Sequence, residues 1–297
     1  MSLIGTYGYP VIGPAGYGQL LFDAGVYQDS LEMLQVRLAQ DFLNLWAAIP
    51  DNADPVRTER YLIERLADMQ LAYGSEAASL AAEFLNMSRE GKDLPMVVAP
   101  PAPEAQVAGT VRWAMSKPAT QALLWGAMQR MANQPYRKTI QDSAFAAGNG
   151  FARVPDANAC GFCLMLASRG AVYYSAQEAR EIGLGRYSKK GSRNRRRDIE
   201  REAIAAGKRP DLRYHDNCRC SVIEVSRDRG LTEANVYLDD LWAKTFYNDP
   251  GPAGDPRFRN ELKTNPKTGR KIQPNLRTWE KVLEEEQLPW VSAKQFY

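Results

Sequence analysis

The first half of the chain carries the hydrophobic pattern of amphipathic helices. From residue 31 onward, apolar side chains recur every three or four positions, a spacing that places them on one face of a helix. The positions on this face are Leu31, Leu34, Leu38, Phe42, Leu45 and Ile49. Pro50 ends the pattern, because proline lacks the backbone N–H that a helix interior uses. We therefore predict a helix that stops before Pro50.

A second helix is predicted to begin at Asp54-Pro55. Aspartate is a favoured N-cap residue, and proline is favoured at the first helical position. The apolar face of this helix consists of Leu62, Leu66, Met69, Tyr73, Ala77, Leu80 and Phe84. An amphipathic helix needs only a surface to pack against, so we interpret both apolar faces as core and not as a groove for a partner.

Prolines interrupt the helical pattern between Leu94 and Pro103, where four of ten residues are proline. A helix cannot continue through such a stretch, so we predict an extended linker. Further helices are predicted over residues 104–115, 120–133, 138–148 and 231–247, the last one opened by Thr232-Glu233. Short β-prone segments lie at residues 171–174 and 221–225.

The character of the chain changes after Asn248. Six prolines are mixed there with charged residues and few aliphatic ones: Pro250, Pro252, Pro256, Pro266, Pro274 and Pro289. Such a composition indicates an extended C-terminal arm that does not bury itself. Its larger apolar residues would be anchors for a partner groove, and they are Trp279, Leu283, Trp290, Phe296 and Tyr297. We expect the arm, from about Pro250, to be ordered only against another component.

Composition agrees with a protein that folds around a core. Hydrophobic residues make up 44% of the 297 residues and charged residues 25%, which is enough for one large or two modest domains. No stretch approaches the roughly eighteen apolar residues of a membrane span. No pattern typical of a signal peptide follows Met1, so we expect a reducing compartment.

All four cysteines and the only histidine fall in two short clusters. Cys160 and Cys163 form a C-x2-C pair, and His215, Cys218 and Cys220 follow about fifty residues later. Zinc prefers four tetrahedral ligands drawn from thiolates and imidazole, so five groups compete for four positions. We predict a closed, structural Zn²⁺ site held by Cys160, Cys163, Cys218 and either His215 or Cys220.

Two other interpretations of the thiols stay open. The cysteines could form two disulfides, or they could be buried as small apolar side chains. A reducing compartment weakens the disulfide interpretation. The C-x2-C spacing favours zinc over both, because a tight turn aims two sulfur atoms at one point.

The net charge of +3 hides a strong asymmetry. Residues 186–213 contain eleven basic and four acidic residues, a net charge of +7 that leaves −4 for the rest of the chain. This basic insert lies between the two halves of the predicted metal site. Its candidate nucleic-acid-binding residues are Lys189, Lys190, Arg193, Arg195, Arg196, Arg197 and Arg201.

Three interpretations of the basic insert are open. It could be a solvated loop, a surface that binds the phosphates of duplex DNA, or a docking surface for an acidic protein. Tyr187 is the only aromatic residue in the run, so stacking on the bases of a single strand is disfavoured.

The two cysteine clusters, in this order and joined by a variable insert, resemble the signature of the phage Mu F-like (MuF) head morphogenesis family. The resemblance covers roughly residues 139–225, and the segment at 154–170 is similar to the versions in tailed phages of actinobacteria. It implies a minor capsid protein, present in few copies inside the head near the portal. The implied partners are the portal protein, the major capsid protein and packaged DNA, and the implied location is the virion, assembled in the host cytoplasm.

Two enzymatic alternatives can be compared with the residues. A zinc deaminase needs a glutamate two positions after its histidine, but Asn217 stands there, and the cysteine pair precedes the histidine. A capsid maturation protease with a histidine base would need His215 free of metal. Ser116-Lys117 and Ser188-Lys189 are nominal Ser-Lys pairs. Whether His215 binds the metal or is free therefore distinguishes a structural protein from a protease.

These inferences combine into one expected organisation. We predict a mainly α-helical protein with a small zinc-stapled α+β domain, a helical N-terminal region and an extended C-terminal arm. The expected divisions are a helical region at 1–93, a linker at 94–103, a zinc-binding domain at 104–230, and a C-terminal helix and arm at 231–297.

Overall fold

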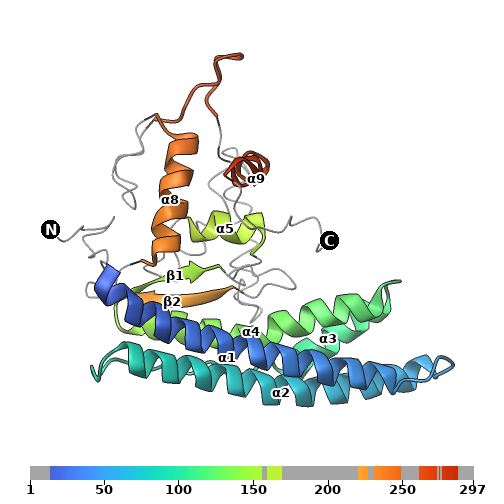
Figure 1. Cartoon of the computed structure of the whole chain (residues 1–297). Coiled ribbons are helices and arrows are strands. Elements are labelled where there is room, and N and C mark those ends of the chain that lie inside the picture. Colours follow the sequence, from blue (N-terminus) through green and yellow to red (C-terminus); the bar gives the residue numbers. More distant parts are fainter. Residues whose placement is uncertain are drawn as a thin grey trace, which may run out of the picture.

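The helical half of the protein is a bundle of four helices (Figure 1). The computed structural model describes residues 14–155, 159–168, 220–226, 231–248, 261–272, 274 and 276–286, with side chains from residue 30 except that of Glu233. The bundle consists of α1 (Pro14–Ala47), α2 (Pro55–Ser88), α3 (Glu104–Met115) and α4 (Thr120–Ala146). The remaining elements are β1 (Gly150–Val154), α5 (Gly161–Ala167), β2 (Ser221–Val225), α8 (Glu233–Phe246) and α9 (Leu276–Glu285).

The first helix ends before Pro50 and the second begins at Asp54-Pro55, as predicted. On α1, Leu31, Leu34, Leu38 and Phe42 are buried. Asp54 caps α2, where its Oδ1 accepts the backbone N–H of Arg57 at 2.9 Å. However, α1 begins at Pro14, well before the apolar pattern that starts at Leu31, so the pattern did not predict its first half.

Polar contacts join α1 and α2 along their antiparallel seam. The Tyr73 hydroxyl donates to Asp41 Oδ2 at 2.5 Å, and Arg37 forms an ion pair with Glu76. Burial raises the pKa of Tyr73 to about 12, with a further contribution from the Asp41 carboxylate. The seam thus combines apolar packing with neighbouring polar bonds near the surface.

The predicted break between residues 133 and 138 is wrong, because α4 continues through Pro135. A proline inside a helix removes a backbone bond and costs about 3 kcal/mol. Packing offsets this cost, since Pro135 is buried against Gly74 of α2. A Cβ on Gly74 would lie 3.0 Å from Pro101 Cβ and 3.4 Å from Pro135 Cγ. The close approach of three segments at this glycine keeps the helix continuous.

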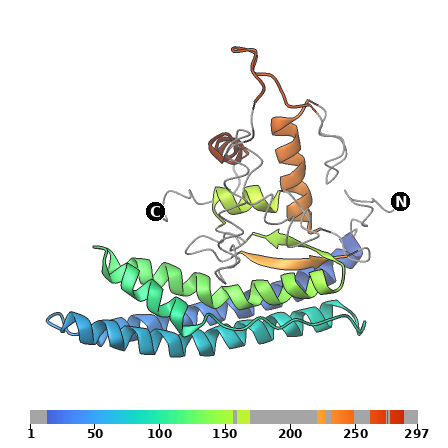
Figure 2. The same cartoon turned by 180° about the vertical axis from the view of Figure 1, so that it is seen from behind.

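The proline-rich stretch is extended, as predicted, and it runs along α4. The backbone N–H of Val97 donates to Ser143 Oγ at 2.8 Å, and that of Ala99 donates to Thr139 Oγ1 at 3.0 Å. Helices on both sides of this stretch pack in the same bundle. The stretch at 94–103 therefore connects helices within one packed unit and does not separate two domains (Figure 2).

A two-stranded antiparallel sheet lies above the bundle. Gly150 pairs with Val225 at one end, and Val154 pairs with Ser221 at the other. The strand at 221–225 was predicted, whereas its partner β1 was not; the predicted strand at 171–174 lies outside the described residues. Both views show the sheet between the bundle on one side and α5 and α8 on the other. The described part of the chain is thus mainly helical with one small sheet.

The prediction of a wholly extended C-terminal arm is wrong. Residues 276–285 form α9, and the side chains of Trp279 and Leu283 are 0% exposed. The Trp279 ring lies edge-on to Trp242 of α8 at 5.3 Å between centroids. Trp279 and Leu283 are four residues apart, so one helical face carries both, and α5 and α8 supply the apolar surface that the arm itself lacks. Trp290, Phe296 and Tyr297 lie outside the described residues.

Candidate metal centre

Strand pairing brings the first cysteine pair and Cys220, the last residue of the second cluster, to one end of the sheet. Cys163 and Cys218 are 55 positions apart in the sequence. Cys160 follows the end of β1 by six residues, and Cys220 directly precedes the start of β2. Because Val154 pairs with Ser221, the chain leaves β1 and enters β2 at the same place. The topology therefore meets the first requirement of a metal site built from both clusters.

The C-x2-C pair begins the short helix α5. Cys160 is its N-cap, and its Sγ accepts the backbone N–H of Cys163 at 3.4 Å. Both residues are buried, with 2% and 1% of their surface exposed. They belong to the apolar cluster that also contains Trp242 and Trp279. Buried thiols joined by a tight turn suit a structural Zn²⁺, which prefers thiolate sulfur in a closed setting.

Asn235 of α8 connects the cysteine helix to the sheet. Its Nδ2 donates to two main-chain carbonyls, that of Arg153 in β1 and that of Ala167 at the end of α5, both at 2.8 Å. The side chain is completely buried. Thr232 Oγ1 accepts the backbone N–H of Asn235 at 3.1 Å and caps α8. These bonds set the position of α5 relative to β1.

Arg137 of α4 holds the second cluster where it joins β2. Its Nε donates to the carbonyl oxygen of Cys220 at 3.0 Å. Arg137 is completely buried and Cys220 nearly so. A buried guanidinium is costly unless its N–H groups are used, so this bond is an integral part of the packing between α4 and the sheet.

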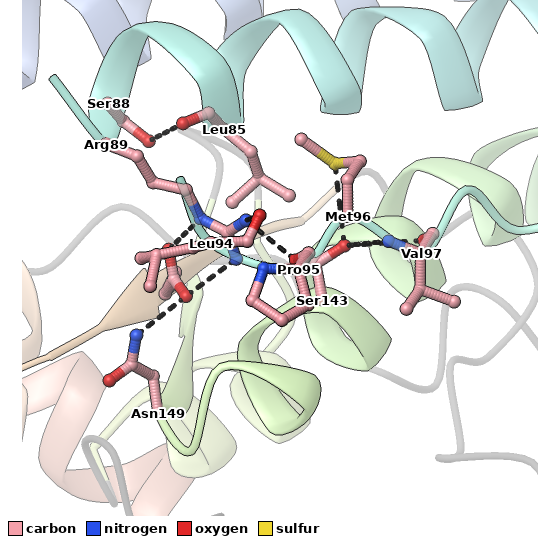
Figure 3. A network of polar contacts seen from close by, with 10 residues as sticks. Leu85, Ser88, Arg89, Leu94, Pro95, Met96, Val97, Ser143 and Asn149 are labelled. Carbon is pink, nitrogen blue, oxygen red and sulfur yellow. Dashed lines mark hydrogen bonds and ion pairs between the residues drawn. The ribbon is translucent and has the colours of Figure 1, made fainter. Parts of the chain in front are cut away.

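A second buried arginine joins the other end of β2 to the bundle (Figure 3). Arg89, the C-cap residue of α2, donates from Nε and Nη2 to the two carboxylate oxygens of Glu224 at 2.8 and 2.9 Å. Its Nη1 donates to the carbonyl of Pro95 at 2.9 Å. Asn149 donates to Glu224 Oε1 at 2.9 Å. This network ties α2, the proline-rich stretch and the turn after α4 to one carboxylate.

The structure brings together only part of the predicted site. Cys160, Cys163 and Cys220 are described and buried, whereas His215 and Cys218 lie outside the described residues. The seven basic candidates of the insert lie outside them as well: Lys189, Lys190, Arg193, Arg195, Arg196, Arg197 and Arg201. Among the residues the structure describes, no group of three or more Cys, His, Asp and Glu side chains is placed to hold a metal ion. The zinc site therefore stays a prediction.

Sequence reasoning did not find the buried polar residues that hold the two ends of β2. Arg89 and Glu224 are 135 positions apart, and Arg137 and Cys220 are 83 apart. No local pattern relates residues at such separations. The one sequence feature that could have indicated such contacts is the number of polar residues on the buried face of α4, which includes Asn133, Arg137 and Gln141.

Comparison with known proteins places the chain in a family. The family model of the VG15 protein matches residues 23–248, which run from within α1 through both cysteine clusters to the end of α8. Searches of the curated proteins and of the solved structures gave no significant match. Among the described helices, none is long and apolar enough to cross a membrane.

Proposed function

The chain belongs to the VG15 protein family, a phage-associated family, and from this premise we propose that it is a minor capsid protein of the MuF head-morphogenesis type. It acts by binding, as a bridge between the portal or the major capsid protein and packaged DNA, and it performs no turnover. The observation that supports the proposal is that Cys160 and Cys163 follow β1 at the end of the sheet where Cys220, the last residue of the second cluster, enters β2. The resemblance to MuF proteins rests on the same clusters.

We assign a structural Zn²⁺ to this end of the sheet. Cys160, Cys163 and Cys218 hold it, together with His215 or Cys220. The metal would cross-link the two cysteine clusters. It would supply no catalytic chemistry, because four protein ligands leave no position for water. The burial of the described cysteines supports a closed site.

The basic insert is the DNA-binding part of the proposal. In the sequence it lies between α5, which ends at Ala167, and β2, which begins at Ser221. Clustered Lys and Arg side chains gain affinity for a duplex by releasing counterions from phosphates, without reading the base sequence. This mode suits packed DNA, whose sequence at any one place in the head is not defined.

The proposed role is tested by composition and cross-linking of purified heads. We expect mass spectrometry to detect the chain in few copies per particle and cross-links that join it to the portal or the major capsid protein. A chain absent from DNA-filled heads overturns the proposal.

A parallel test separates the structural role from a protease. The variant His215→Ala is assembled with the capsid protein, and cleavage of that protein is followed by gel electrophoresis. We expect the same cleavage pattern as with the wild-type chain. Loss of cleavage in His215→Ala but not in Cys163→Ser, which should lose the metal as well, would identify an enzyme.

A further inference from the structure

We propose that the hairpin at residues 261–272 is a DNA-binding element, which contacts the phosphates of duplex DNA through Lys267 and Arg270 at its tip. The inference rests on the proposed function for the class of partner, duplex DNA, but it places the contact outside the basic insert. The hairpin lies beyond residues 23–248, which the family model matches. The structure describes all of its residues.

The base of the hairpin is fixed to the body of the protein. Its first strand pairs with the residue that follows α8, in a bridge between Leu262 and Tyr247. The backbone N–H of Lys263 donates to the carbonyl of Phe246 at 2.9 Å. Leu262 and Ile272 pack against the apolar cluster that α8 shares with α5 and α9. The hairpin is therefore anchored at its base.

Asn265 fixes the shape of the tip. Its Oδ1 accepts the backbone N–H groups of Lys267 and Thr268 at 2.9 and 3.3 Å. Its main-chain carbonyl accepts the N–H of Gly269 at 2.8 Å. Gly269 has a φ of 65°, a conformation that glycine adopts without strain. The tip is thus a preformed loop, and less ordering is needed when it binds a partner.

The tip is the part of the hairpin that a partner can reach. Figures 1 and 2 show the hairpin projecting beyond α8 and α9, at the end of the molecule opposite the bundle. Residues 266–271 are all exposed. A two-stranded ribbon is narrow enough to enter the major groove of B-DNA, which is about 12 Å wide. The shape of the hairpin therefore suits a duplex.

The positive charge of the tip is available for a ligand. Nearer the base, Lys271 Nζ forms an ion pair with Glu261 Oε1 at 2.7 Å. The side chains of Lys267 and Arg270 have no ion-pair partner among the residues that the structure describes. Two cations on either side of one exposed turn are thus left to bind an anion.

The composition of the tip favours phosphate over a protein surface. Residues 263–271 consist of lysine, arginine, threonine, asparagine, proline and glycine, with no large aliphatic or aromatic residue. Protein interfaces are anchored by aromatic and other large side chains and are depleted in lysine. Lys, Arg, Thr and Asn side chains all bond DNA phosphates. The lack of an aromatic residue also disfavours stacking on a single strand.

The bundle carries the opposite charge. Residues 31–93, which contain half of α1 and all of α2, hold eleven acidic and six basic residues, a net charge of −5. The hairpin holds four basic residues and one acidic residue, a net charge of +3. A duplex is attracted to one end of the molecule and repelled by the other. In the bridge of the proposed function, the hairpin end therefore faces DNA and the bundle faces the protein partner.

The experiment measures binding of the full chain to a labelled duplex by fluorescence anisotropy over a range of salt concentrations. The hairpin variant combines Lys267→Gln with Arg270→Gln. The matched control combines Arg57→Gln with Arg60→Gln, which removes two exposed cations from the start of α2. Both double variants change the net charge equally, so a difference between them reports position. Circular dichroism confirms that each variant is folded.

We expect the hairpin variant to lower the steepness of log affinity against log salt by up to about 1.8, because each lost phosphate contact removes about 0.9. The control should keep the wild-type steepness. The same decrease should appear when the hairpin variant is combined with glutamine at Arg195, Arg196 and Arg197, because each phosphate contact contributes separately to the slope.

Two negative outcomes differ in meaning. Unchanged steepness in the hairpin variant, with a wild-type chain that binds the duplex, overturns the hairpin contact alone. A wild-type chain that binds no duplex at low salt overturns the DNA contact of the proposed function and this inference with it.

Cross-linking identifies the partner of the tip directly. A photoreactive benzophenone side chain replaces Thr268 at the tip or, as the control, the exposed Met33 on α1. In purified heads we expect a cross-link to DNA from position 268 and not from position 33. A cross-link from position 268 to the portal or capsid protein, and not to DNA, would assign the hairpin to protein docking and overturn the inference.

Discussion

The bundle and the small sheet domain are stabilised by different means. In the bundle, helical faces of leucine, methionine and alanine pack along much of their length, and α2 alone buries ten residues. In the sheet domain, two five-residue strands and the seven-residue α5 pack through an apolar cluster that continues into α1, α2 and α4. Buried polar groups from distant parts of the chain add to this packing. A single substitution in the sheet domain can therefore remove a polar bond between elements far apart in the sequence, which an apolar substitution in the bundle does not.

Removal of the metal should have the largest effect and should fall mainly on the sheet domain. Structural zinc binding contributes folding free energy of about 10–16 kcal/mol in small domains. We expect a chelator, or Cys163→Ser, to abolish hydrogen-exchange protection of residues 150–154, 161–167 and 221–225. The amides of residues 62–70 in α2 should stay protected, because Leu62 and Leu66 pack in a cluster of bundle helices that does not contain the cysteines. Unchanged exchange in all three segments would contradict a metal-dependent fold.

Two further variants decide the fourth ligand. Cys220, Val222 and Glu224 alternate along one face of β2, and Glu224 on that face meets Arg89 of the bundle. We therefore expect Cys220→Ser to keep one Zn²⁺ per chain and His215→Asn to lose it, as measured by elemental analysis. The opposite pattern would make Cys220 the ligand and His215 the spare residue.

Breaking the buried pair between Arg89 and Glu224 should have the next largest effect. Arg89→Met leaves a carboxylate buried without its cation, which costs about 3–5 kcal/mol. Urea unfolding measures the loss. The matched control is Arg37→Met, which removes an exposed pair with Glu76 and should cost at most about 1 kcal/mol. The double variant Arg89→Met, Glu224→Leu should recover part of the stability. Equal losses in Arg89→Met and Arg37→Met would contradict the difference expected between a buried and an exposed ion pair.

Trp279→Ala tests whether α9 belongs to the sheet domain. The side chain is 0% exposed, and truncating a buried tryptophan costs about 3–5 kcal/mol at most, less where neighbours collapse into the space. We expect a lower urea midpoint and faster exchange in α5. Trp113→Ala, at an exposed position on α3, should change the midpoint little. A urea midpoint unaffected by Trp279→Ala would indicate that α9 is a separate arm and not part of the sheet domain.

Neutralising Arg195, Arg196 and Arg197 should weaken duplex binding by the insert while leaving both regions folded. Each phosphate that the protein no longer neutralises lowers the steepness of log affinity against log salt by about 0.9. We expect the triple glutamine variant to lower this steepness by up to about 2.7, as measured by fluorescence anisotropy on a labelled duplex. An unchanged slope, or no binding by the wild-type chain at low salt, would assign the insert to protein docking.

The smallest effect is expected at the seam of the bundle. The pKa of Tyr73 is about 12 in the folded chain and 10.0 as a free side chain. The stability it contributes is fully present below pH 10 and is lost as pH rises from about 10 to 12. Because the phenol lies near the surface, we expect less than about 1 kcal/mol. Tyr73→Phe should lack this alkaline loss in thermal melts. An alkaline loss of stability of the same size in Tyr73→Phe would show that other groups cause it.

Periodicity and capping, which depend only on residues close together in the sequence, predicted several elements correctly. Helix α3 has the bounds predicted for residues 104–115, and the Asp54 and Thr232 caps lie where the sequence placed them. Pro135 shows the limit of such rules. Its effect on α4 depends on Gly74 and Pro101, which approach it only in the folded chain.

The sequence by itself determined the helical class, most helix ends and the identity of the candidate metal ligands. These follow from periodicity, caps and residue chemistry, which are properties of short segments. Only the tertiary structure decided that β1 pairs with β2, that Trp279 and Leu283 are core, and that Arg137 meets Cys220. The physical reason is distance along the chain. A buried polar bond between residues 83 positions apart satisfies both partners only after the fold has brought them together.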